Sequence, residues 1–170
     1  MRDYAEAARS FDHARAAAAA LHGNLEALNA CVECCDRHSG SDKTALVCED
    51  RDGNSERYTF DQLQVLAARF ANVLKAQGVG AGDRVAGLMP RTPELLVTIL
   101  ATWRLGAVYQ PLFTAFGPKA IEHRLEQSHA KVVVTDRHNR PKLDEVEDCP
   151  ILVTVGAAEG ELDFHRSLET

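Results

Sequence analysis

The spacing of apolar residues predicts alternating strands and helices in the second half of the chain. Strands are expected at 85–89, 107–113 and 131–135, and the last has the β-branched core of a strand buried on both faces. Apolar residues at helical spacing predict helices over 93–105 and 118–128. This alternation implies right-handed crossovers. We therefore predict an α/β fold with a largely parallel, doubly wound sheet flanked by helices.

The first half of the chain has a different pattern. Strands at 44–49 and 56–60 flank an Asp-Gly turn, which is a strong signal for a β-hairpin. The next helix carries apolar residues at helical spacing from Leu63 to Leu74. Before the hairpin, an alanine-rich helix is expected over 4–22 and a second helix over 25–38.

These elements fit one domain in residues 1–170, because no low-complexity linker divides the chain. A short helix near 141–146 and a last strand at 151–155 are expected to complete its sheet. The predicted parts are a helical lead-in (1–43), a hairpin (44–60), an α/β core (61–158) and a tail that trails off (159–170).

Composition narrows the function classes. The chain has 170 residues, 45% of them hydrophobic, and a net charge of -6. That charge argues against a nucleic-acid partner, which requires a basic face. No apolar run approaches the roughly 20 residues of a membrane span, and the N-terminus lacks the pattern of a signal peptide. We therefore expect no membrane span and a cytoplasmic location.

Two clusters invite a chemical interpretation that the pattern does not favour. Cys31, Cys34, Cys35 and His38 fall on one face of the predicted helix, and one helix cannot easily surround a tetrahedral zinc ion. We expect buried thiols and no metal. The glycines at 78, 80 and 82 follow a helix and precede a strand, whereas a phosphate-binding loop has the opposite order. We expect a helix end and a tight turn there.

Ligands of such sheets bind beyond the carboxyl ends of the strands. The segment after the second strand, Phe113 to Gly117, is the most suggestive, because Phe113 and Phe116 could stack on an adenine ring. The alternative is that both rings complete the core. Small side chains at Thr114 and Ala115 would let a ligand approach the backbone. Three cations follow the next strand and could reach a phosphate: Arg137, Arg140 and Lys142.

The stretch from Tyr58 to Asp136 carries a family resemblance. Its characteristic segments are Tyr-Thr-Phe-Asp-Gln-Leu from Tyr58, Gly-Asp-Arg-Val-Ala-Gly-Leu-Met-Pro from Gly82, Gly-Ala-Val-Tyr-Gln-Pro-Leu-Phe from Gly106, and Ala-Lys-Val-Val-Val-Thr-Asp from Ala130. It resembles the N-terminal part of AMP-forming acyl-CoA synthetases, within the adenylate-forming ligase superfamily. These enzymes use ATP and Mg to convert a small-molecule carboxylate into an acyl-adenylate, releasing pyrophosphate. Coenzyme A then displaces AMP.

The resemblance also implies site residues. The loop at Phe113, Thr114 and Ala115 would contact the adenine end of coenzyme A. Arg140, with Arg137 as second choice, would approach the nucleotide phosphate. One departure is that Thr114-Ala115 stands where acetyl-specific relatives often have two glycines.

Other parts of such an enzyme are not found in this sequence. It has no Ser/Thr/Gly-rich phosphate loop with a lysine, and it ends at Thr170, before the family's ribose-binding acidic residue and C-terminal lysine would appear. We find no other catalytic set. We therefore expect an N-terminal portion that is inactive alone, binds at most coenzyme A, and self-associates through exposed sheet surface.

Two alternatives remain at this point. One is a complete, non-catalytic binding or interaction module that has the same fold. The other is an unrelated nucleotide-binding domain, which is less favoured because its first strand–helix turn, Met89 to Thr92, lacks glycine.

Overall fold

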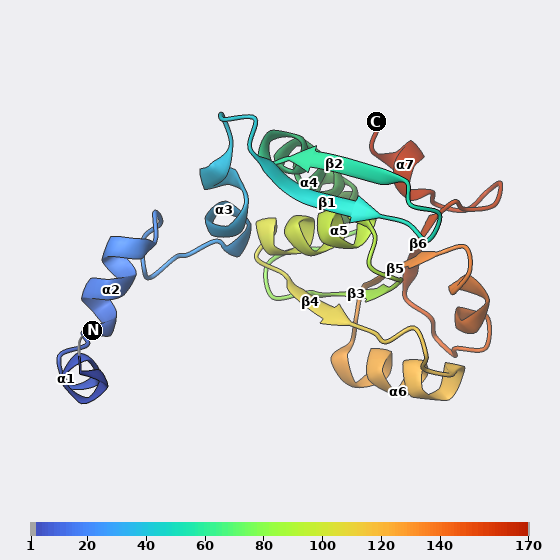
Figure 1. Cartoon of the computed structure of the whole chain (residues 1–170). Coiled ribbons are helices and arrows are strands. Elements are labelled where there is room, and N and C mark those ends of the chain that lie inside the picture. Colours follow the sequence, from blue (N-terminus) through green and yellow to red (C-terminus); the bar gives the residue numbers. More distant parts are fainter. Residues whose placement is uncertain (1–2, 170) are drawn as a thin grey trace.

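A four-stranded parallel sheet forms the centre of the computed structural model, which describes residues 3–169 (Figure 1). The strand order is β4-β3-β5-β6. The strands are β3 (Arg84–Leu88), β4 (Val108–Pro111), β5 (Val132–Asp136) and β6 (Ile151–Val155). Helix α5 (Pro93–Arg104) joins β3 to β4, and α6 (Pro118–Ser128) joins β4 to β5. The predicted α/β class is confirmed.

Both faces of this sheet are covered. Val132 and Val134 of β5 point into one core cluster, which they share with α5 and with α4 (Phe60–Ala76). Val133, between them, points into a second cluster with α6. Figure 1 shows α4 and α5 on one side of the sheet and α6 on the other. The unbroken valine run therefore reflects a strand without a solvent-facing side, and the doubly wound arrangement is confirmed.

A glycine in β3 allows a close contact inside the sheet. A Cβ atom at Gly87 would lie 2.3 Å from the hydroxyl oxygen of Tyr109 in β4. Burial of this ring raises the pKa of Tyr109 to about 12. Opposite Gly87 in the same strand pair stands Pro111, which is tolerated because β4 is at the sheet edge.

The hairpin precedes α4 and is joined to it by a capping box. Strands β1 (Thr44–Glu49) and β2 (Ser55–Thr59) pair antiparallel, as predicted. The Thr59 side chain accepts a hydrogen bond from the Gln62 amide at 3.2 Å, and the Gln62 side chain accepts one from the Thr59 amide at 2.8 Å. This reciprocal pair satisfies two amides that the helix leaves open and fixes its start.

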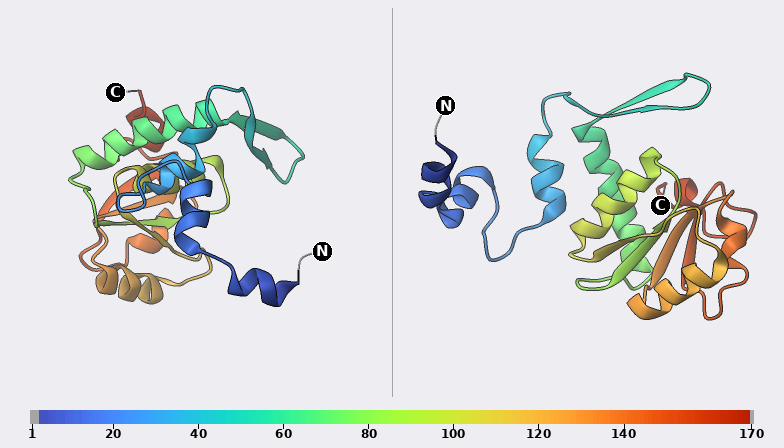
Figure 2. Two further views of the ribbon diagram at one scale, coloured as in Figure 1. Left: turned by 90° about the vertical axis from the view of Figure 1, so that its left-hand side faces the viewer. Right: turned by 60° about the horizontal axis from the view of Figure 1, so that its bottom comes forward.

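The prediction of a single helix over residues 4–22 is wrong. The structure has two short helices, α1 (Tyr4–Arg9) and α2 (His13–Ala20). The helix is interrupted between them because the Asp12 side chain accepts a hydrogen bond from the Arg15 amide and caps the start of a new helix. Neither helix buries a residue, and both lie away from the sheet (Figure 2).

The prediction of one helix over residues 25–38 is also wrong. Asn29 caps the amides of Cys31 and Val32, so helix α3 starts late and covers only Ala30–Cys34. A separate 3-10 turn, η1, follows at Asp36–His38. Cys31 and Cys35 face the same core cluster, whereas Cys34 is exposed, so the three cysteines do not share one face.

The sulfur atoms in this region are instead divided between core and surface. Cys31 and Cys35 are buried and Cys34 is exposed, and burial raises the pKa of Cys31 to about 11 and of Cys35 to about 12. All five cysteines are free. Within residues 3–169, no group of three or more His, Cys, Asp or Glu residues could hold a metal ion.

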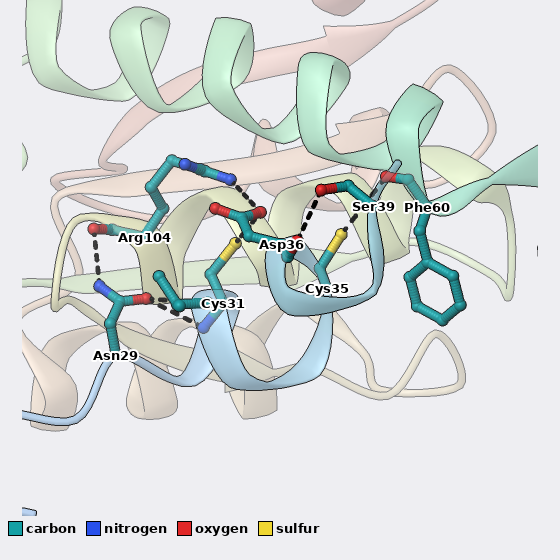
Figure 3. Close-up of polar contacts among 8 residues, drawn as sticks. Asn29, Cys31, Cys35, Asp36, Ser39, Phe60 and Arg104 are labelled. Atoms are coloured by element: carbon teal, nitrogen blue, oxygen red, sulfur yellow. Dashed lines mark hydrogen bonds and ion pairs between the residues drawn. The ribbon is translucent and has the colours of Figure 1, made fainter. Parts of the chain in front are cut away.

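Two polar contacts of Arg104, with Asp36 and Asn29, attach this region to α5 (Figure 3). Arg104, at the end of α5, forms an ion pair with Asp36 of η1. The Asn29 side chain donates to the Arg104 carbonyl oxygen at 3.1 Å, in addition to capping α3. The two contacts hold α3 and η1 against the helix that covers the sheet.

Residues 159–169 do not trail off as expected. After the 3-10 turn η2 (Arg140–Leu143) and strand β6, a β-bridge joins Thr154 to Asp163, and a short helix, α7 (Phe164–Ser167), follows. Phe164 is buried, and its ring centroid lies 4.4 Å from that of Phe70 in α4. Phe164 and Leu168 therefore belong to the core, which the isolated Phe164 did not indicate in the sequence.

We expect Phe164→Ala to lower the free energy of unfolding by about 3 kcal/mol, because it leaves a cavity beside Phe70. Phe11→Ala removes a 57% exposed ring from the N-terminal helices and should change it by no more than about 0.5 kcal/mol. Urea unfolding followed by circular dichroism compares the two variants. Equal effects would mean that α7 does not contribute to the core.

Candidate functional site

The candidate site lies at the carboxyl edge of the parallel sheet. The loop 113–117 follows β4, and the segment 137–142 follows β5, two strands away in the sheet. Both segments lead to the face of the sheet that α6 and η2 cover. The loop after β3 leads instead to α5 on the other face, so neighbouring connections diverge at this edge. Such divergence is where doubly wound sheets bind ligands.

The two phenylalanines of the loop have different environments. Phe116 packs against the second core cluster, and the guanidinium carbon of Arg124 lies 4.0 Å from its ring centroid. Phe113 is 63% exposed and meets Phe116 edge to face at 5.7 Å between centroids. The interpretation as core residues therefore holds for Phe116, and Phe113 offers an open ring.

The two small residues between them need no glycine-like backbone. Neither Thr114 nor Ala115 adopts a positive φ. The Thr114 carbonyl oxygen accepts a hydrogen bond from the Lys142 ammonium. Ala115 is exposed. The loop thus takes its shape without a glycine at either position.

Asn139 was missed by the sequence analysis. It is buried, and both its amide and its side-chain nitrogen donate to one Asp136 carboxylate oxygen, at 2.7 and 2.8 Å. Its side-chain oxygen accepts from Lys142 at 3.0 Å. The available signal was Asp136, three residues earlier at the end of a strand, where aspartate commonly stabilises a turn.

The two candidate arginines differ in their partners. Arg140 forms ion pairs with Asp144 and, at 3.2 Å, with Glu161. The hydrogen bond to Asp144 is the main reason that the pKa of Arg140 is raised above its usual value. Arg137 is exposed and makes no ion pair within residues 3–169. In the same part of the chain, the cation that bonds to the loop is Lys142.

The glycines at 78–82 form a closed turn. The Val79 amide donates to the Leu74 carbonyl oxygen at 3.0 Å, which ends α4 in the usual glycine-dependent way. The Gly80 amide donates to the Asp83 carboxylate at 2.8 Å, and Lys131 forms an ion pair with the same carboxylate. Hydrogen bonding by Lys131 lowers the pKa of Asp83. The Gly80 amide is thus already hydrogen-bonded to a carboxylate of the chain itself, and the prediction of a structural turn is confirmed.

Comparisons with known proteins agree with this architecture. The model of the AMP-binding enzyme family matches residues 33–169. A crystal structure of a Brucella canis acyl-CoA synthetase superposes with a TM-score of 0.94 and 49% identity, over 100% of this chain and 32% of that one. The chain therefore belongs to the AMP-binding enzyme family.

Two similar proteins are named acetyl-coenzyme A synthetase. The Bacillus subtilis protein is 39% identical over 167 residues, which is 96% of this chain and 29% of the relative. The Sodalis glossinidius protein is 48% identical over 111 residues, which is 64% of this chain and 17% of the relative. The chain thus spans about a third or less of each. No helix within residues 3–169 is long and apolar enough to cross a membrane.

Proposed function

We propose that this chain is the N-terminal portion of an AMP-forming acyl-CoA synthetase, which joins a small carboxylic acid to coenzyme A using ATP and Mg. The observation that carries the proposal is the match of the whole chain to an acyl-CoA synthetase structure at 49% identity. A cytoplasmic location is part of the proposal and is supported by five free cysteines, which suit a reducing compartment.

Within that enzyme, the portion would supply scaffold and one side of the coenzyme A entrance. The exposed ring of Phe113 is suited to stack on adenine, and Thr114 and Ala115 continue the same surface. Arg140 would have to exchange the exposed Asp144 for a phosphate group, whereas Arg137 has no ion pair to exchange in the described residues. Both therefore remain candidates for the phosphate contact.

The first test asks whether the chain alone forms an adenylate. We expect no pyrophosphate release with ATP, Mg and acetate, because none of its residues provides the lysine-bearing phosphate loop that stabilises the transferred group. A coupled pyrophosphate assay measures this, with the full-length Bacillus subtilis enzyme as positive control. Pyrophosphate release above background would contradict the proposal that this chain alone cannot form an adenylate.

The second test addresses the coenzyme A entrance. We expect Phe113→Ala to weaken coenzyme A binding about tenfold, since stacking of a base on an aromatic ring is worth about 1–3 kcal/mol. Phe11→Ala, which removes a ring of similar exposure elsewhere, should leave binding unchanged. Isothermal titration gives both affinities.

The same titration separates the two arginines. We compare Arg140→Met with Arg137→Met. The arginine that contacts the phosphate is the one whose replacement weakens coenzyme A binding and reduces the salt dependence of that binding. Equal affinity of wild type and Phe113→Ala would remove the loop from the binding site.

The third test concerns self-association. One edge of the sheet is partly covered, because β6 bonds to Leu162 and bridges to Asp163. The other edge is β4, where Val108 is 53% exposed, so we expect pairing through β4 and a dimer or larger species at high concentration. Light scattering should show Val108→Lys as monomer and Val65→Lys, on α4, as unchanged. A monomeric wild type would refute the idea.

A further inference from the structure

We propose that Lys142 is a positioning residue, which holds loop 113–117 in the conformation that presents Phe113 to a ligand. This inference rests on the proposed function, because it takes the loop as part of the coenzyme A entrance. Lys142 does not face the ligand in this role. It acts through the Thr114 carbonyl, to which its ammonium donates a hydrogen bond across 28 residues of sequence.

The base of this contact is rigid. Lys142 belongs to η2, where its amide donates to the Asn139 carbonyl oxygen at 3.1 Å. The next residue, Leu143, is 2% exposed and lies in the second core cluster. Asn139 is buried and donates two hydrogen bonds to Asp136, at the end of β5. The ammonium therefore extends from a segment that is fixed to both the core and the sheet.

The partners of the ammonium are unusual for a surface lysine. Lys142 is half-buried, and its two hydrogen-bond acceptors are neutral oxygens, those of Thr114 and Asn139. Within residues 3–169 it makes no ion pair with a carboxylate. Such charge-assisted bonds to neutral groups are stronger than ordinary hydrogen bonds. The contact thus favours one position of the Thr114 carbonyl.

The loop is held at a second point beyond Thr114. The Phe116 ring lies against the Arg124 guanidinium, and the Phe116 amide donates to the Phe113 carbonyl oxygen at 2.9 Å. Residues 114 and 116 are therefore both held, and the ring of Phe113 is left exposed beside them. A loop ordered before binding loses less entropy when the ligand arrives, which increases affinity.

The test compares three variants of this chain. Lys142→Met removes the ammonium and keeps the length of the side chain, Lys142→Arg restores a charged donor, and Lys119→Met removes an 82% exposed lysine on neighbouring α6 as the control. Amide hydrogen exchange of residues 113–117, measured by NMR, reports loop order. Titration with coenzyme A reports affinity, and thermal unfolding reports stability.

We expect Lys142→Met to accelerate exchange in the loop and to weaken coenzyme A binding about tenfold, with a melting temperature close to that of Lys119→Met. Lys142→Arg should recover most of the affinity. A purely structural role would instead lower the melting temperature without selective loss of loop protection.

The outcomes distinguish this inference from the proposed function. Unchanged loop exchange in Lys142→Met, or unchanged affinity in that variant while Phe113→Ala loses binding, would overturn the positioning role and leave the entrance in place. If the wild-type chain does not bind coenzyme A, the entrance is wrong, and the exchange data alone decide whether Lys142 orders the loop.

Discussion

The burial of β5 on both faces is the constraint on which the rest of this structure depends. Its three valines have no exposed surface, so helices must cover both sides of the sheet, and connections must pass to opposite faces. That requirement separates the loop after β3 from those after β4 and β5. The edge where ligands bind in such folds is thus a consequence of how the core is buried.

The strongly periodic segments could be predicted from the sequence, because their side chains report directly on burial. The strands, the hairpin and α4 to α6 lie close to where the apolar pattern indicates. The N-terminal helices could not be placed, because Asp12 and Asn29 interrupt patterns that continue on either side of them. Propensity alone favoured longer helices, and local capping by these two side chains overrode it.

The candidate site was predictable only in part. An aromatic pair after a strand indicates a ligand-facing loop, but its division into a core ring at Phe116 and an open ring at Phe113 depends on Arg124 and the packing of α6. The partners of Arg140 are Asp144, four residues away, and Glu161, which only the folded chain brings near. Contacts between segments distant in sequence leave no periodic signal in either segment.

The close approach of Gly87 to Tyr109 has an evolutionary consequence. Any other residue at position 87 would place its Cβ atom against the tyrosine hydroxyl, so the half-buried ring of Tyr109 in the edge strand would have to move. The two positions are therefore coupled. In relatives, a side chain at the equivalent of Gly87 should occur more often with a smaller residue than with tyrosine at the equivalent of Tyr109, and this covariation should be visible in a large family alignment.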